Sequence, residues 1–98
     1  MAVAVEIDIV GGTLEQYDQV INKMGLRPGG PGGGPGCLFQ WVTKTDNGYR
    51  VVGVWETKAQ CERFAQEKLE PITAETGFPG PSQITFYEVH NYLTKSLD

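Results

Sequence analysis

The residue best suited to acid–base chemistry in this 98-residue sequence is its single histidine, His90. Histidine is the side chain whose ordinary pKa lies nearest neutrality, so it accepts or donates a proton at physiological pH. Glu88 stands two residues earlier, on the same face of a predicted strand, where it could orient the ring. We therefore expect His90 to be a candidate general acid or base. The competing interpretation is a strand histidine that makes one structural hydrogen bond or is simply exposed.

Two acidic residues near the N-terminus, Glu6 and Asp8, are the second set of candidates for proton transfer. They alternate with Val5, Ile7 and Ile9, and side chains alternate between the two faces of a strand. If the aliphatic face packs against helices, the two acids point to the opposite side, into the interior of a dimer. Carboxyl groups in such a place could transfer protons. The other interpretation is that both acids lie near a solvated rim.

Aromatic residues in three predicted strands could line an apolar cavity for a small ligand. They are Trp41, Trp55, Phe86 and Tyr87, with Glu88 next to the last of them. Ligand pockets are lined mainly by apolar and aromatic side chains with a few polar groups among them. The alternative is that these aromatics form the core or a dimer interface.

The sequence predicts no metal site and no cofactor. A structural zinc site needs four ligands, and the chain offers two cysteines, Cys37 and Cys61, besides the one histidine. Both cysteines are expected to be reduced thiols in the cytoplasm, since no signal peptide precedes them. The glycine- and proline-rich stretch 27–36 is not a phosphate-binding loop, because it leaves a predicted helix and enters a strand. It is instead a long connection that could act as a lid.

Periodicity and turn residues define the elements that must position these side chains. Capping boxes at Thr13 and Thr57 mark two helix starts, and Asn47-Gly48 favours a type I′ hairpin turn. In the second helix, Pro71 is expected to stop or kink the chain, although another turn could follow. Its predicted inward stripe is Cys61, Phe64, Ala65, Lys68 and Leu69. The expected elements are strands 2–10, 37–44, 49–56 and 83–93, a helix over 13–24 and a second helix from residue 57.

This order, β-α-β-β-α-β, predicts a single α+β domain over residues 1–98 with a ferredoxin-like fold. Its four strands form an antiparallel sheet in the order 4-1-3-2, with both helices on one face. The other face would carry large apolar side chains and needs a cover, which a second copy provides most simply. We therefore expect a homodimer whose two sheets pack face to face.

Charge and hydropathy exclude several classes of partner. The formal net charge is −4, and lysine and arginine are scattered. Binding to nucleic acid or to an anionic membrane surface relies on clustered cations. No apolar stretch approaches the ~20 residues that a membrane-spanning helix needs. We expect no nucleic-acid partner and no membrane association.

The stretch Val51–Ala59, VVGVWETKA, resembles the dimeric α/β-barrel family of ferredoxin-like proteins. In it a strand ends in Trp-Glu and passes into a capped helix. The element order of the whole chain supports the same resemblance. The family includes antibiotic-biosynthesis-monooxygenase-like and stress-response domains. The resemblance implies a dimer that binds a small apolar or aromatic molecule, or a cofactor-free monooxygenase-like enzyme. Haem degradation is disfavoured, because the first strand lacks an asparagine and the histidine is not on a helix.

Two other functions remain open from the sequence. One is a non-catalytic binding or structural dimer with the same fold. The other is an RNA-binding domain of the RRM type, which shares the element order and has an aromatic third strand, GYRVVGVW at 48–55. Against it, Val51 and Gly53 occupy positions where base-stacking aromatics would be wanted.

Overall fold

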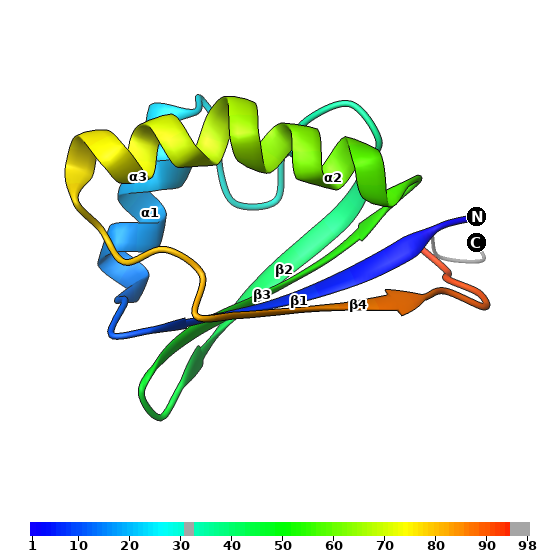
Figure 1. The fold of residues 1–98 in the computed structure, drawn as a ribbon, viewed down its shortest axis with the longest axis horizontal. Helices are drawn as coiled ribbons and strands as arrows, with labels where there is room; N and C mark the ends of the chain where they lie inside the picture. Colours follow the sequence, from blue (N-terminus) through cyan, green and yellow to red (C-terminus); the bar gives the residue numbers. More distant parts are fainter. Residues whose placement is uncertain (31–32, 95–98) are drawn as a thin grey trace.

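The computed structural model describes residues 1–30 and 33–94 of the chain. A four-stranded sheet lies under a layer of helices (Figure 1). No helix in this part of the chain is long and apolar enough to cross a membrane. The elements are β1 (Val3–Val10), α1 (Leu14–Lys23), β2 (Cys37–Thr45), β3 (Gly48–Trp55), α2 (Lys58–Phe64), the π-helix η1 (Ala65–Leu69), α3 (Glu70–Thr76) and β4 (Gln83–Glu88).

The sheet is antiparallel in the order β2-β3-β1-β4, which is the predicted order 4-1-3-2 counted from the other edge. The helices of the described residues lie on one face of it. There α2, η1 and α3 run as one long rod over the sheet, and α1 lies at the α3 end of the rod (Figure 1). The predicted α+β, ferredoxin-like architecture is confirmed. The opposite face of the sheet, called here the open face, is not covered by any helix of residues 1–30 and 33–94 (Figure 1).

The core lies between the helices and the sheet. In β1 the alternation sends Val5, 2% exposed, towards the helices. There it joins Trp55, also 2% exposed, together with Cys61 and Phe64. The Trp55 and Phe64 rings are 5.4 Å apart between centroids, a separation typical of favourable aromatic contact.

Helix α1 begins as predicted. The Thr13 side chain accepts a hydrogen bond from the backbone N–H of Gln16, and the Gln16 side chain accepts one from the Thr13 N–H. This capping box satisfies two N–H groups that have no partner inside the helix. The helix ends at Lys23 with Met24 as its C-cap, and Gly25 follows with a positive φ of 76°.

The second helix does not stop at Pro71 but continues through the π-helix η1. Proline has no N–H to donate to the carbonyl four residues earlier, and its ring crowds that carbonyl. The N–H of Glu70 donates a hydrogen bond to the carbonyl of Ala65, five residues earlier, which is the pattern of a π-helix. The helix continues through Pro71 after this turn. Because of the extra residue in the π turn, the next residue after Phe64 to pack on the core is Leu69. Lys68 is exposed. The prediction that Lys68 points inward was wrong for this reason.

The hairpin between β2 and β3 differs from the predicted turn. Its two connecting residues are Asp46 and Asn47, and neither has the positive φ that a type I′ turn requires. Gly48 is instead the first residue of β3. A Cβ there would collide with the carbonyl oxygen of Ile9, so glycine permits close approach of the two strands.

Strand β4 ends at Glu88 rather than at residue 93. Glu88 pairs with Val3, and the last bond of the ladder runs from the Val89 N–H to the Ala2 carbonyl at 3.0 Å. Since β1 begins at Val3, Glu88 is the last residue of β4 with a strand partner. Residues 90–94 are therefore outside the sheet.

Candidate functional site

The four aromatic residues predicted to line one pocket lie on two different faces of the sheet. Trp55 and Phe86 face the helices, and the Lys58 ammonium sits 4.6 Å from the centre of the Phe86 ring. Trp41 and Tyr87 lie on the open face and are 51% and 52% exposed. The structure therefore does not bring these residues into a single cavity.

Glu6 and Asp8 lie on the open face, as their alternation predicted, and both contact Arg50. The Arg50 Nε is 2.6 Å from Asp8 Oδ1 and 3.5 Å from Glu6 Oε1. The Tyr87 hydroxyl donates to Glu6 over 3.5 Å. The hydrogen bond to Asp8, and then the Asp8 charge, raise the pKa of Arg50. The two carboxylates thus share one permanent cation across neighbouring strands.

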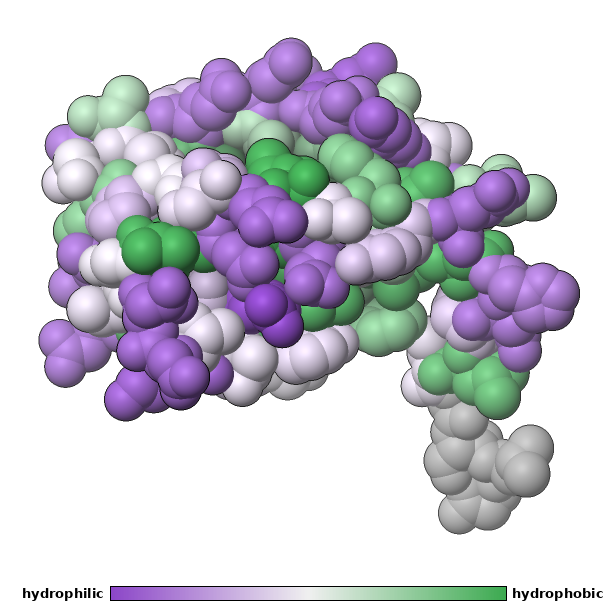
Figure 2. All heavy atoms as spheres, turned by 60° about the horizontal axis from the view of Figure 1, so that its bottom comes forward, coloured by the Kyte–Doolittle hydropathy of each residue, from purple (hydrophilic) through white to green (hydrophobic). Residues whose placement is uncertain are grey.

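The open face mixes these charges with apolar side chains. Figure 2, in which the sheet side is turned forward, shows hydrophobic and hydrophilic atoms interspersed over this side of the molecule. Tyr49, the aromatic that the RRM-type interpretation needed, is instead buried on the helix side. Its ring lies 5.6 Å from that of Tyr17 in an edge-on contact.

His90 and Glu88 lie at the end of the sheet where β1 starts. Both side chains are exposed, and His90 is in a bend after β4. Its neighbour Val89 bonds to Ala2, which is four residues before Glu6, or about 13 Å along an extended strand. The structure therefore does not bring His90 together with Glu6 or Asp8.

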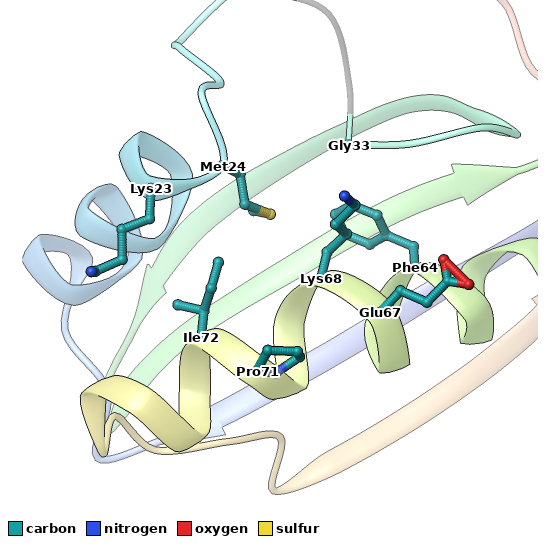
Figure 3. Close-up of a pocket in the computed structure, with 8 residues that line it drawn as sticks. All are labelled: Lys23, Met24, Gly33, Phe64, Glu67, Lys68, Pro71 and Ile72. Carbon is teal, nitrogen blue, oxygen red and sulfur yellow. The ribbon is translucent and has the colours of Figure 1, made fainter.

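The side chains that do converge on a cavity come from the helix layer. A groove of about 440 Å³ lies between the end of α1, the connection that follows it and the α2–η1–α3 rod (Figure 3). We call it the helix groove. Met24 and Phe64 belong both to this groove and to the core, so the groove opens directly onto apolar packing. Its lining residues are Lys23, Met24, Gly33, Phe64, Glu67, Lys68, Pro71 and Ile72.

Two lysines contribute to the helix groove, and they differ in their partners. Lys23 Nζ is 3.1 Å from Glu75 Oε1, and Figure 3 shows it directed away from the centre of the groove. Lys68 extends beside the Phe64 ring, with its amine towards the space between Met24 and Gly33. Among the described residues, no carboxylate forms an ion pair with Lys68.

The glycine-rich connection forms one wall of the helix groove. A Cβ on Gly33 would lie 2.7 Å from the Phe64 ring, and one on Gly34 would lie 2.8 Å from it. Gly36 has a φ of 91°, and its carbonyl accepts a hydrogen bond of 2.8 Å from the Glu56 N–H. Glycine is needed here because the backbone itself packs on the second helix.

A second groove of about 440 Å³ runs along the edge of the sheet between α1 and β2. Its walls include Ile21, Leu26, Phe39 and Trp41. It reaches Trp41 but none of the other predicted site residues.

The two cysteines are poor candidates for nucleophilic or metal chemistry. Burial, and then the nearby Cys37 and Glu62, raise the pKa of the Cys61 thiol to about 11. Burial also raises the pKa of Cys37. The reactive form of cysteine is the thiolate, which these environments disfavour. Within residues 1–30 and 33–94, no three His, Cys, Asp or Glu side chains cluster in a way that could hold a metal ion.

The helix groove was not predicted from the sequence. Phe64 was expected on the inward stripe of the second helix, but its convergence with Met24, Gly33 and Ile72 depends on how three separate segments meet. The only local signal was Lys68, a charged residue within an otherwise apolar stripe.

No protein-family model matches the sequence, and no curated protein sequence matches it. Among solved structures, the chain is similar to SnoaB, a cofactor-independent oxygenase from Streptomyces nogalater. The TM-score is 0.59 at 16% identity, over 96% of this chain and 97% of that one. A mutant of SnoaB gives 0.56 with the same identity and coverage. A structural-genomics protein, YJCS, gives 0.58 at 7% identity, over 92% of this chain and 100% of that one.

At these identities the likeness shows the fold. The resemblance to antibiotic-biosynthesis-monooxygenase-like domains is thereby confirmed at the level of the fold.

Proposed function

We propose that the chain binds a small aromatic molecule in the helix groove and acts on it as a cofactor-independent monooxygenase. The observation that carries the proposal is the groove itself, about 440 Å³ and open onto the apolar core. That volume lies within the ~300–1,000 Å³ range of small-molecule sites. The similarity of fold to a cofactor-independent oxygenase supports the choice of reaction class.

An oxygenase without a cofactor needs a substrate that supplies all the electrons. A ring methylene can do so, since CH2 + O2 gives C=O + H2O with one oxygen atom in each product. The substrate must first lose a proton, which leaves negative charge spread over the ring system. The protein then has to bind the rings, exclude water and accept that proton.

His90, Glu6 and Asp8 do not line the helix groove. We therefore keep His90, with Glu6 or Asp8 assisting, as a separate proposal for the proton acceptor, tested independently of the groove. His90 is the only histidine of the sequence. Removal of a general base typically costs 10²–10⁴-fold in rate. If His90 accepts the proton, His90→Gln should lower turnover by about a hundredfold or more. An unchanged rate would remove His90 from the mechanism and leave the helix groove as the proposed ligand site.

The test of the function is dioxygen uptake by the purified protein with anthrone, a tricyclic aryl ketone that has one acidic ring methylene. The expected result is uptake above the buffer rate that Ile72→Glu abolishes, because a charge then replaces an apolar wall of the groove. The matched control is Ile84→Glu, at an isoleucine that is 50% exposed and outside the groove. Uptake at the buffer rate, or uptake insensitive to Ile72→Glu, would contradict the proposal.

We also propose that a second copy of the chain covers the open face. Trp41 and Tyr87 expose about half of their surface there, and exposed aromatics on a sheet face are typical of an interface. A non-catalytic binding dimer is the alternative function. It shares the groove and the dimer but would show no dioxygen uptake.

A further inference from the structure

We propose that the helix groove selects aromatic ligands that carry an ionised acidic oxygen group, and that Lys68 recognises this group. The inference rests on the proposed function, in which the helix groove is the ligand site. It adds the class of ligand, an aromatic acid or ionised phenol, and the residue that distinguishes it from a neutral compound of the same shape.

Lys68 is the cation of the groove that is available to a ligand. The other lysine in the lining, Lys23, is held 3.1 Å from Glu75 and points away from the groove centre (Figure 3). The Lys68 amine lies beside the apolar floor made by Met24 and Phe64. Among the described residues, it has no carboxylate partner. An aromatic ligand on that floor would place an acidic substituent within reach of the amine.

The groove lining also contains an acidic residue, Glu67, but its carboxylate is not paired with the Lys68 amine. Successive residues of a helix do not face each other. Figure 3 shows the Glu67 carboxylate apart from the Lys68 amine, and among the described residues no ion pair joins the two. The site therefore presents a positive charge towards its apolar floor, although the chain as a whole has a net charge of −4.

The π-helix explains how a lysine comes to lie at this edge. In an uninterrupted α-helix, Lys68 would follow Phe64 by four residues and Cys61 by seven, on the buried stripe. An ammonium group there would be costly to bury. The extra residue of the π turn places Leu69 on the core and leaves Lys68 beside Phe64 at the groove mouth. Single π turns are frequent at functional sites in proteins.

The experiment compares two probes of nearly the same aromatic shape. 1-Anilinonaphthalene-8-sulfonate carries one anionic group, and N-phenyl-1-naphthylamine is the same ring system without it. Their fluorescence on binding is titrated with the wild-type protein and with Lys68→Ala, Lys68→Arg and Lys44→Ala. Lys44 is an exposed lysine of β2 outside both grooves and serves as the matched control.

Lys68→Ala should weaken binding of the sulfonate on the order of tenfold, which is typical of one charge-assisted hydrogen bond. Binding of the neutral amine should change less than twofold. Lys68→Arg should restore most of the sulfonate affinity, and Lys44→Ala should leave both probes unchanged. Equal effects of Lys68→Ala on the two probes, or an equal effect of Lys44→Ala on the sulfonate, would overturn the inference.

The variant Ile72→Glu separates this inference from the proposed function. If it abolishes binding of the neutral amine while Lys68→Ala leaves the sulfonate unaffected, the helix groove is a ligand site without selection for acids. If neither probe is sensitive to Ile72→Glu, the groove is not their site, and both proposals fail.

Discussion

The buried Cys61 thiol makes the stability of the folded protein depend on pH in the alkaline range. It lies in the cluster with Val5, Trp55 and Phe64, and burial is the main reason that its pKa rises from 9.0 to about 11. The folded protein therefore keeps a proton on this thiol at a pH where the unfolded chain releases it. Such a group contributes stability that is complete below pH 9.0 and is lost as the pH rises towards 11.

We predict that the free energy of unfolding of the wild-type protein falls as the pH rises above 9.0, and that Cys61→Ala reduces this slope. Urea unfolding at several pH values measures it, and the slope is compared rather than the absolute stability, because the alanine also leaves a small cavity. Val54→Ala serves as the matched control, since it truncates a side chain that is as buried as Cys61 but does not titrate. An unchanged slope in Cys61→Ala would contradict the account.

At the scale of elements, the connection between α1 and β2 is a packed wall of the groove where the structure describes it. Its residues Gly33 and Gly34 touch the Phe64 ring through their backbone. The same ring is part of the core and of the groove floor. Changes in this connection should therefore affect both stability and ligand binding.

Gly33→Ala should lower the free energy of unfolding by about 1–3 kcal/mol, the usual cost of forcing an extra methyl group into a packed site. The new Cβ would lie 2.7 Å from the Phe64 ring, so the wall or the ring must move. The matched control is Gly80→Ala, where the nearest atom, on Thr73, is 3.9 Å away. Thermal or urea unfolding measures both. Equal stability of the two variants would show that the wall does not pack as described.

The elements differ in how far the sequence alone predicts them. The alternation in β1 and the capping box at Thr13 are local patterns, and they correctly predicted a strand and a helix start. The order of the elements along the chain then predicted the correct sheet order. The end of β4 depends on where its partner strand begins, and the π turn depends on how the chain accommodates Pro71. Neither depends on local pattern alone. The candidate site was missed for the same reason, since its side chains come from segments that only the fold brings together.

At the scale of the whole molecule, the open face of the sheet exposes aromatic side chains that a single copy of the chain does not cover. It carries the ion pairs of Arg50 with Asp8 and Glu6 among the half-exposed rings of Trp41 and Tyr87. Packing a second sheet against it would bury these rings. The helix groove lies on the other side of the sheet, so a dimer of this kind leaves it accessible.

We predict a solution mass of twice the chain's 10.8 kDa by light scattering. Trp41→Glu should shift the mass to that of one copy, because a carboxylate would then be buried without a partner. Ile84→Glu, at an equally exposed apolar residue that faces away from the open side, should leave the mass unchanged. A single-copy mass for the wild-type protein would contradict the dimer without affecting the groove.

The central claim is that the helix groove holds an aromatic ligand, and the most direct measurement is of nuclear Overhauser effects between N-phenyl-1-naphthylamine and the methyl groups of the protein. The account predicts cross-peaks from the probe rings to the Met24 ε-methyl and the Ile72 δ-methyl, which line the groove. Cross-peaks confined to methyl groups of the open face, such as those of Val52, or no cross-peaks with a bound probe, would contradict it.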